Sequence, residues 1–207
     1  EQGMFLNNRQ TQKTNTANWA GAHRLLTNRL AQAAVIETTA RSILEEGLAY
    51  DRCLVGVVTD MDGFDTLADH DVREQGQMTR VMRTQIDVVL SEGAGVLNAD
   101  EEQVVDLARL CDGEVLLYST QADNAHIATH RADNAEGRAV FVKNNQVILA
   151  TGAQERVLGT LDALSLPGGR RPDTPALLAA IAAAWSMDIA PDLIGAGIKT
   201  FEYTPAA

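Results

Sequence analysis

Apolar and polar residues follow one another along the chain in blocks that predict strands and helices in turn. Short apolar runs rich in β-branched residues predict buried strands at 33–36, 53–58, 94–100 and 114–120. Helical spacing of apolar residues predicts helices at 40–48, 78–90 and 101–110. Strands that alternate with helices indicate an α/β fold, a mostly parallel sheet with flanking helices.

The start and the end of the chain add further elements to this pattern. Apolar residues at helical spacing from Trp19 onward predict a helix with Asn18 as its N-cap, while the polar run 7–18 predicts a surface loop. Beyond the Pro/Gly-rich stretch 167–175, which we interpret as a loop, two further helices are expected at 176–187 and 191–201.

An antiparallel hairpin is predicted after the parallel strands. Two β-rich runs, 139–142 and 147–150, flank a turn over 143–146 that contains two asparagines. We therefore expect a small antiparallel subsheet, over residues 137–166, within the same domain.

Charge and composition exclude several functional classes. The chain has 207 residues, 45% of them hydrophobic, and a net charge of −11, so it lacks the basic patch that nucleic acid requires. No apolar run reaches the roughly 20 residues of a membrane span, and no signal peptide is visible. We expect a soluble cytoplasmic protein with two buried free thiols, Cys53 and Cys111.

Few residues are candidates for chemistry. Glu37 follows the first predicted strand, where α/β folds gather ligands, and its carboxylate could hold a hydrated Mg²⁺. On position alone, a helix cap or a solvated carboxylate at the sheet edge is the favoured interpretation. The acidic stretch 60–75 is expected to be a solvated loop, and His126 and His130 are expected to be exposed. The sequence contains neither a Walker loop nor a Gly-x-Ser-x-Gly motif.

Several longer segments of the sequence resemble those of a known family. The runs VIETTARSILEEGLAYDRCLVGVVTD, VLNADEEQVVDLARLCDGEVLLY and ALLAAIAAAWSMDIAPDLIGAGIKTF resemble the Mur ligase-like central domain of cyanophycin synthetases. The resemblance covers nearly the whole chain in consistent order. It implies that residues 1–207 form part of that domain, with the phosphate-binding loop upstream and the carboxyl-terminal lobe downstream.

The resemblance also implies ligands and roles. The family uses ATP and Mg²⁺ to activate the aspartate side-chain carboxylate of a poly-aspartate primer as an acyl phosphate, which the amine of arginine attacks. Glu37 corresponds to the carboxylate that helps to hold Mg²⁺, and Asn98 to the residue that recognises adenine, with Asp100 beside it. The other interpretation of Asn98–Asp100 is a turn in which Asp100 caps the next helix. The expected partners are the remaining domains of the parent ligase, the cyanophycin primer and arginine. The sequence is also compatible with a homo-oligomer.

The chain departs from the family motifs at several positions. After Glu37 the chain reads Thr-Thr-Ala-Arg-Ser, so both glycines of the Glu-Thr-Ala-Arg-Gly-Gly motif are replaced and the arginine is displaced. The Asp-His-Leu-Gly signature corresponds to residues 65–68, Asp-Thr-Leu-Ala, while Asp60 and Ala176 stand where the family has asparagine. We therefore expect the isolated chain to bind ATP weakly and to be inactive. Two alternatives remain: a degenerate Mur ligase-like domain with a structural or oligomerisation role, and an unrelated small-ligand-binding α/β domain.

Overall fold

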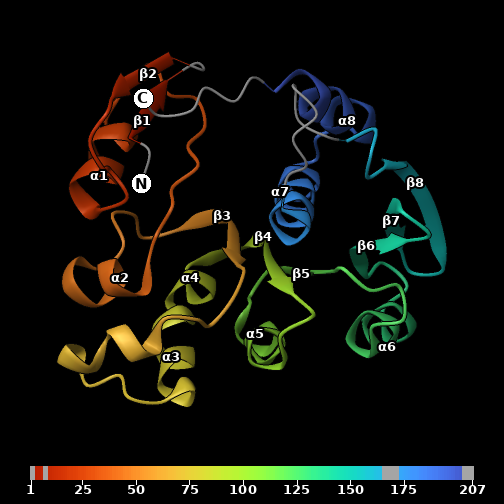
Figure 1. The fold of residues 1–207 in the computed structure, drawn as a ribbon, viewed down its shortest axis with the longest axis horizontal. Helices are drawn as coiled ribbons and strands as arrows, with labels where there is room; N and C mark the ends of the chain where they lie inside the picture. The colour runs from red at the N-terminus through yellow and green to blue at the C-terminus, as the bar shows by residue number, and fades with distance from the viewer. Residues whose placement is uncertain (1–2, 7–8, 165–172, 202–207) are drawn as a thin grey trace. The chain divides into compact units, whose positions relative to one another are not determined.

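A computed structural model describes residues 3–6, 9–164 and 173–201 (Figure 1). The chain forms two compact units. The first, called unit 1, comprises mainly Glu1–Asp51 and Gly63–Thr84, and the second, unit 2, comprises Arg52–Asp62 and Gln85–Tyr203. No helix among the described residues is both long and apolar enough to cross a membrane.

Unit 2 is built on a 6-stranded sheet in which the strands follow one another in chain order. The strands are β3 (Cys53–Val58), β4 (Val89–Asn98), β5 (Glu114–Ser119), β6 (Arg138–Lys143), β7 (Gln146–Thr151) and β8 (Gln154–Thr160). Strands β3 to β6 are parallel, whereas β7 and β8 are antiparallel to their neighbours. The predicted fold class, a mostly parallel sheet with an antiparallel hairpin, is confirmed.

Helices cover both faces of the unit 2 sheet. Helix α7 (Thr174–Ser186) packs on β4, β5 and β6, while α5 (Glu102–Val105) packs on β4 and α6 (Ala125–Asp133) packs on β5 and β6 from the opposite side (Figure 1). Helix α8 (Pro191–Thr200) packs against β8, and η3 (Asp106–Leu110) continues α5. This three-layer arrangement buries the apolar strands on both faces, as parallel sheets require.

Arg138 contacts the last turn of α7 at the amino ends of the strands. Arg138, the first residue of β6, pairs with Glu114, the first residue of β5, and donates from Nη1 to the carbonyl of Trp185 at 3.0 Å. Its guanidinium also lies 5.1 Å from the Trp185 ring centroid. Because Trp185 belongs to the last turn of α7, this helix begins at Asp173, its N-cap, at the opposite, carboxyl edge of the sheet.

The turn between β6 and β7 has the backbone that a tight hairpin needs. Asn144 and Asn145 have φ values of 51° and 62°, and two consecutive residues in this region make a type I′ turn, whose twist matches that of the strands. Asparagine tolerates this conformation better than most residues. The predicted hairpin is therefore confirmed at its turn.

Unit 1 holds short elements. They are β1 (Met4–Leu6), β2 (Arg9–Gln12), α1 (Trp19–Leu26), α2 (Ala40–Glu46), α3 (Gln75–Met82) and the 3-10 helices η1 (Phe64–Thr66) and η2 (Ala68–His70). Asn18 caps α1 by accepting from the amide of Gly21 at 2.8 Å, as expected. Strands β1 and β2 pair antiparallel, so the prediction of a loop over 7–18 was wrong for β2. The polar β2 residues carry no apolar alternation that would have revealed a strand.

The strand expected at 33–36 is absent from the structure. The chain there belongs to no strand, and the side chain of Val35 is 92% exposed. Residues 33–35 are exposed, so this run has no buried face that would favour a strand. Glu37 consequently does not stand at the end of a strand, and Thr39, rather than Glu37, caps α2.

The helix expected at 78–90 was also too long. Helix α3 ends at Met82, α4 covers Thr84–Asp87, and β4 begins at Val89. Val89 fits a helical apolar face and a β-branched strand equally well, and pairing with Cys53 of β3 decides in favour of the strand. Likewise, the helix predicted at 101–110 divides into α5 and η3.

Candidate functional site

The candidate site lies at the carboxyl edge of unit 2, where β3, β4 and β5 end. Val58 of β3 is in register with Leu97 of β4, and Asn98 of β4 is in register with Tyr118 of β5. Parallel strands in register place the segments that follow them side by side. Residues 59–62, 98–101 and 118–120 therefore form one continuous edge.

Asn98 is the centre of this edge. It is only 7% exposed, its Nδ2 donates to the carbonyl of Thr59 at 2.9 Å, and its Oδ1 accepts from the amide of Asp100 at 3.1 Å. A carboxamide has two N–H donors and two lone pairs. The donor joins the end of β4 to the end of β3, and the acceptor closes a local turn with Asp100. Within the described residues one further donor and one further acceptor have no partner, which is the pair that a base edge requires.

Asp100 makes several hydrogen bonds through its carboxylate, and its expected place in a nucleotide pocket stays a prediction. Its carboxylate accepts from Ser119 Oγ, from Thr120 N at 2.8 Å and Thr120 Oγ1 at 2.7 Å, and from Asn124 Nδ2 at 3.3 Å. These bonds occupy the roughly four acceptor positions of a carboxylate. The expected cap was wrong, because Glu101 is the N-cap residue of α5 and makes no side-chain cap bond. Asp100 instead fastens the end of β4 to the end of β5.

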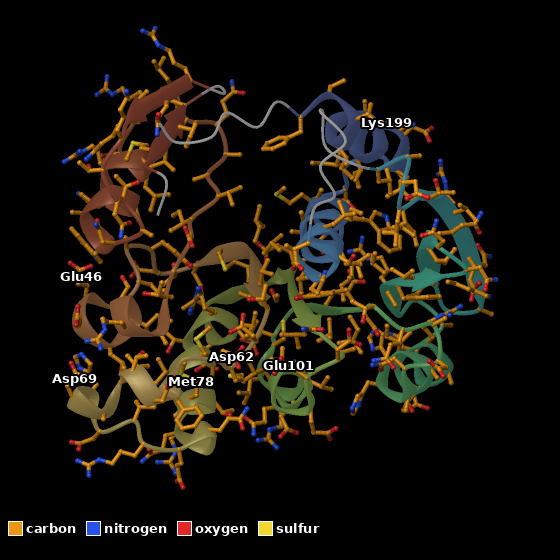
Figure 2. All side chains as sticks on the ribbon, in the orientation of Figure 1. Glu46, Asp62, Asp69, Met78, Glu101 and Lys199 are labelled. Carbon is orange, nitrogen blue, oxygen red and sulfur yellow. The ribbon has the colours of Figure 1, made fainter. Side chains whose placement is uncertain are left out.

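Further carboxylates gather around this edge. Burial raises the pKa of Glu101, and the charges of Asp62, Asp60 and Asp100 raise it further. Asp62 and Glu101 lie in the same part of unit 2 in Figure 2. Asp60 accepts from Thr59 Oγ1 at 2.7 Å and from the amide of Asp62 at 3.1 Å. The edge is therefore strongly acidic.

Tyr118 is a buried polar group that sequence reasoning missed. Its side chain is fully buried, and its phenol oxygen has no hydrogen-bond partner within the described residues. Burial raises its pKa, and the charges of Asp60, Asp100, Glu101 and Asp173 add to the rise. The only signal in the sequence was a tyrosine inside an apolar strand one residue from its end, which by itself indicates a core residue.

Glu37 belongs to unit 1 and lines a large cavity there. The cavity has a volume of about 1090 Å³ and is bordered by β1, α1 and the segment 30–37. Within the described residues, no group of three or more His, Cys, Asp or Glu side chains could hold a metal ion. Mg²⁺ is often held by one or two carboxylates together with substrate phosphates and water. A single carboxylate at Glu37 fits that mode of binding, and it stays a prediction.

The displaced arginine of the family motif has a structural role in unit 1. Arg41 pairs with Glu45 at 3.1 Å and with Asp69 at 2.9 Å, and it lowers the pKa of Asp69. Its Nη2 also donates to the carbonyl of Thr66. Arg41 thereby connects α2 to η1 and η2, and the acidic loop is more ordered than the sequence indicates.

The remaining polar candidates are partly buried. His126 Nε2 lies 3.0 Å from a carboxylate oxygen of Glu102, and His130 Nε2 is buried without a partner in the described residues. The prediction that both histidines are exposed was wrong, because α6 packs His130 towards β5 and β6 and burial lowers its pKa. Cys53 and Cys111 are free thiols of intermediate exposure, and burial raises the pKa of each.

The chain is similar in sequence to several cyanophycin synthetases. The chain is 30% identical over 204 residues to the cyanophycin synthetase of Crocosphaera subtropica, covering 97% of this chain and 23% of the relative. It is 31% identical over 210 residues to that of Synechocystis sp., covering 98% of this chain and 24% of the relative. The chain thus spans about a quarter of the length of these relatives. No family model matches it.

A solved structure shares the fold. The UDP-N-acetylmuramoylalanyl-D-glutamyl-2,6-diaminopimelate–D-alanyl-D-alanyl ligase of Acinetobacter baumannii superposes with a TM-score of 0.54 at 11% identity, over 86% of this chain and 36% of that protein. At this identity the likeness shows the fold alone. The expected resemblance to cyanophycin synthetases and the expected Mur ligase fold are both confirmed.

Proposed function

Because the chain is related to one segment of the cyanophycin synthetases and has a Mur ligase fold, we propose that it is part of an ATP-dependent ligase. The observation that carries the proposal is the sequence similarity, which runs through 97% of the chain. The finer form of the proposal is that the parent enzyme joins arginine to the aspartate side-chain carboxylates of cyanophycin. Residues 1–207 would form part of its Mur ligase-like domain, and the other domains would supply the rest of the active site.

The proposed nucleotide pocket is the carboxyl edge of unit 2. When bound, ATP would supply the phosphoryl group that activates a carboxylate, and Mg²⁺ would neutralise its charge. Asn98 would meet the adenine edge with its remaining donor and acceptor. Asp100 would act as a positioning residue, because its carboxylate already holds Ser119, Thr120 and Asn124. Glu37 is proposed as the carboxylate that helps to hold Mg²⁺.

Titration calorimetry of the folded chain with Mg²⁺ and a non-hydrolysable ATP analogue tests this proposal. We expect weak, saturable binding that Asn98→Ala abolishes, because the substitution removes both groups that would face adenine. Asn98→Asp retains the acceptor for the Asp100 amide and serves as a second variant if Asn98→Ala does not fold. Asn134→Ala, an exposed residue at the end of α6, is the matched control and should bind as the unsubstituted chain does.

A second candidate function is a degenerate domain that keeps a structural or oligomerisation role. The replacements in the family motifs favour it, since Arg41 is committed to Glu45 and Asp69 in unit 1. Absence of binding heat from a chain that circular dichroism shows to be folded would support this candidate over the ligase. Measurable ATP hydrolysis by the isolated chain would contradict our expectation that it is inactive alone.

A further inference from the structure

The starting observation is the side chain of Asn124, the residue that caps the start of α6. Its Oδ1 accepts from the amides of His126 at 3.0 Å and Ile127 at 3.2 Å. Its Nδ2 donates to the carbonyl of Ala99 at 2.8 Å and, at 3.3 Å, to the carboxylate of Asp100. A carboxamide has two N–H donors and two lone pairs, and these four bonds use all of them. Asn124 therefore acts on a ligand only through the groups that it holds.

The bond to Ala99 reaches Asn98 through a single peptide group. The carbonyl of Ala99 and the amide N–H of Asp100 belong to the same peptide bond, and this N–H donates to Asn98 Oδ1 at 3.1 Å. Because a peptide group is planar and rigid, the bond from Asn124 that fixes its C=O also fixes the direction of its N–H. The Asn124 side chain, the peptide group and the Asn98 side chain thus form a continuous chain of hydrogen bonds, in which each bond strengthens the next.

The Ala99 carbonyl depends on Asn124 for its hydrogen bond. Ala99 is 2% exposed, so water has little access to it, and a buried carbonyl needs a partner. In the part of the chain that the structure describes, the donor to this carbonyl is Asn124. The amide of Ala99 donates to the carbonyl of Tyr118 at 2.7 Å, but that amide belongs to the preceding peptide group. The tie to α6 is therefore what holds the peptide group that faces Asn98.

The orientation of Asn98 determines what it can offer a base. The carbonyl of Thr59 only accepts and the N–H of Asp100 only donates, so these two backbone groups decide which side of the carboxamide is Nδ2 and which is Oδ1. Adenine carries a donor, its N6 amino group, where guanine carries an acceptor, O6. A carboxamide in a fixed orientation matches one of these two bases, whereas one that rotates can match either.

We propose that Asn124 is the positioning residue that gives the carboxyl edge a preference for adenine, because it fixes the Asn98 carboxamide through the Ala99–Asp100 peptide group. The proposal rests on the proposed function, since it takes this edge as the nucleotide pocket. It adds the source of base specificity, which lies in a residue of a different helix that does not contact the nucleotide.

The substitution Asn124→Ser separates the two roles of this side chain. Serine caps helices about as well as asparagine, so the variant keeps an acceptor for α6 and loses the donor to Ala99. Asn18→Ser at the start of α1 is the matched control, because Asn18 likewise accepts from the amide of Gly21 and donates to the carbonyl of Asn15. Asn124→Asp is the second variant, which keeps the cap and places an oxygen against the Ala99 carbonyl.

Nuclear magnetic resonance of the whole chain without nucleotide provides the first measurement. We expect Asn124→Ser to shift the side-chain NH₂ signals of Asn98 and to speed exchange of the Asp100 amide proton about tenfold, because that N–H loses its fixed direction. The capped amides of α6 should exchange as before, since their acceptor remains. Asn18→Ser should change none of these signals.

Titration calorimetry with non-hydrolysable ATP and GTP analogues, each with Mg²⁺, provides the second measurement. We expect Asn124→Ser to reduce the preference for the ATP analogue about fivefold, because a carboxamide that rotates no longer distinguishes the two bases. A general loss of structure would instead weaken the two analogues equally. Asn18→Ser should keep the preference of the unsubstituted chain.

Two results would overturn the proposal. They are unchanged signals of Asn98 and Asp100 in a folded Asn124→Ser variant, and an unchanged ratio of the affinities for the two analogues. Failure of the ligase proposal has a different signature, since neither analogue then gives heat with the unsubstituted chain. That result overturns the preference for adenine, while altered Asn98 signals in Asn124→Ser would still establish the hydrogen-bond chain from α6.

Discussion

At the scale of single residues, the carboxyl edge shows that one polar side chain can have a structural role where its position suggests a ligand. Asp100 follows a buried parallel strand, the place where α/β proteins gather ligands. Its oxygens nevertheless accept hydrogen bonds from Ser119, Thr120 and Asn124. Within the part of the chain that the structure describes, Asn98 beside it keeps one donor and one acceptor without a partner, so the two neighbours differ in what they can offer a ligand.

We expect Asp100→Ala to destabilise the chain by about 1–3 kcal/mol, because it leaves the two Thr120 donors without their acceptor and removes one of the two acceptors of the buried Ser119 hydroxyl. Urea denaturation followed by circular dichroism measures the difference. Asp112→Ala, an exposed acid at the other end of β5, should change stability by less than about 0.5 kcal/mol. Equal effects of the two substitutions would show that the Asp100 bonds contribute nothing in solution.

At the scale of elements, helix α6 places a titratable side chain, His130, in a partly buried position. His130 lies on the face of α6 that packs towards β5 and β6, and burial holds its pKa below the usual value for histidine. The charge of Glu114 and the backbone of Arg138 and Val115 act in the opposite direction but are weaker than burial. His130 is therefore neutral in the folded chain at neutral pH.

A lowered histidine pKa makes stability depend on pH. Below about 6.5, the ordinary pKa of histidine, the unfolded chain binds a proton that the folded chain does not, so the free energy of unfolding decreases as the pH falls. We expect His130→Gln to flatten this dependence between pH 7 and pH 5. Urea denaturation at several pH values measures it, with His23→Gln in α1 as the exposed control. The same slope in the His130→Gln variant and the unsubstituted chain would refute a buried, neutral His130.

At the scale of the whole molecule, the two units differ in the core that supports them. Unit 2 buries a continuous cluster from the sheet and its helices, with Leu116, Val140 and Leu178 among its fully buried members. In unit 1 the fully or nearly buried apolar side chains are fewer within the described residues, and they are Ala22, Leu67, Val72, Met78 and Val81. Local stability follows the density of buried contacts.

Amide hydrogen exchange followed by mass spectrometry should therefore show slower exchange in unit 2 than in unit 1. We expect the amides of β4 and β5 to exchange on the order of a hundredfold more slowly than those of β1 and β2, because exchange in a weakly packed element needs only local opening. Uniform protection along the described residues would instead indicate that the whole chain unfolds as one cooperative block.

Much of the fold follows from local patterns that sequence alone can reveal. The apolar runs of β3 and β5, the N-cap Asn18 and the Asn144–Asn145 turn all depend on residues close in sequence, and each was found where expected. The similarity to cyanophycin synthetases is likewise a property of the sequence, and it extends over 204 residues. Both the family resemblance and the α/β rhythm can thus be recognised in the amino-acid sequence.

Tertiary structure decided the points at which local preference is ambiguous. The run 33–36 has the composition of a strand but lacks a neighbouring strand in the described residues, whereas Val89 joins β4 because β3 pairs with it. The hydrogen bonds of Asp100 and the burial of the Tyr118 phenol arise from segments that are distant in sequence. Sequence by itself determined most of the strands and helices of unit 2, since short-range propensity and periodicity are local. Only the tertiary structure decided which polar groups are satisfied, because their partners are brought together by the packing of the sheet.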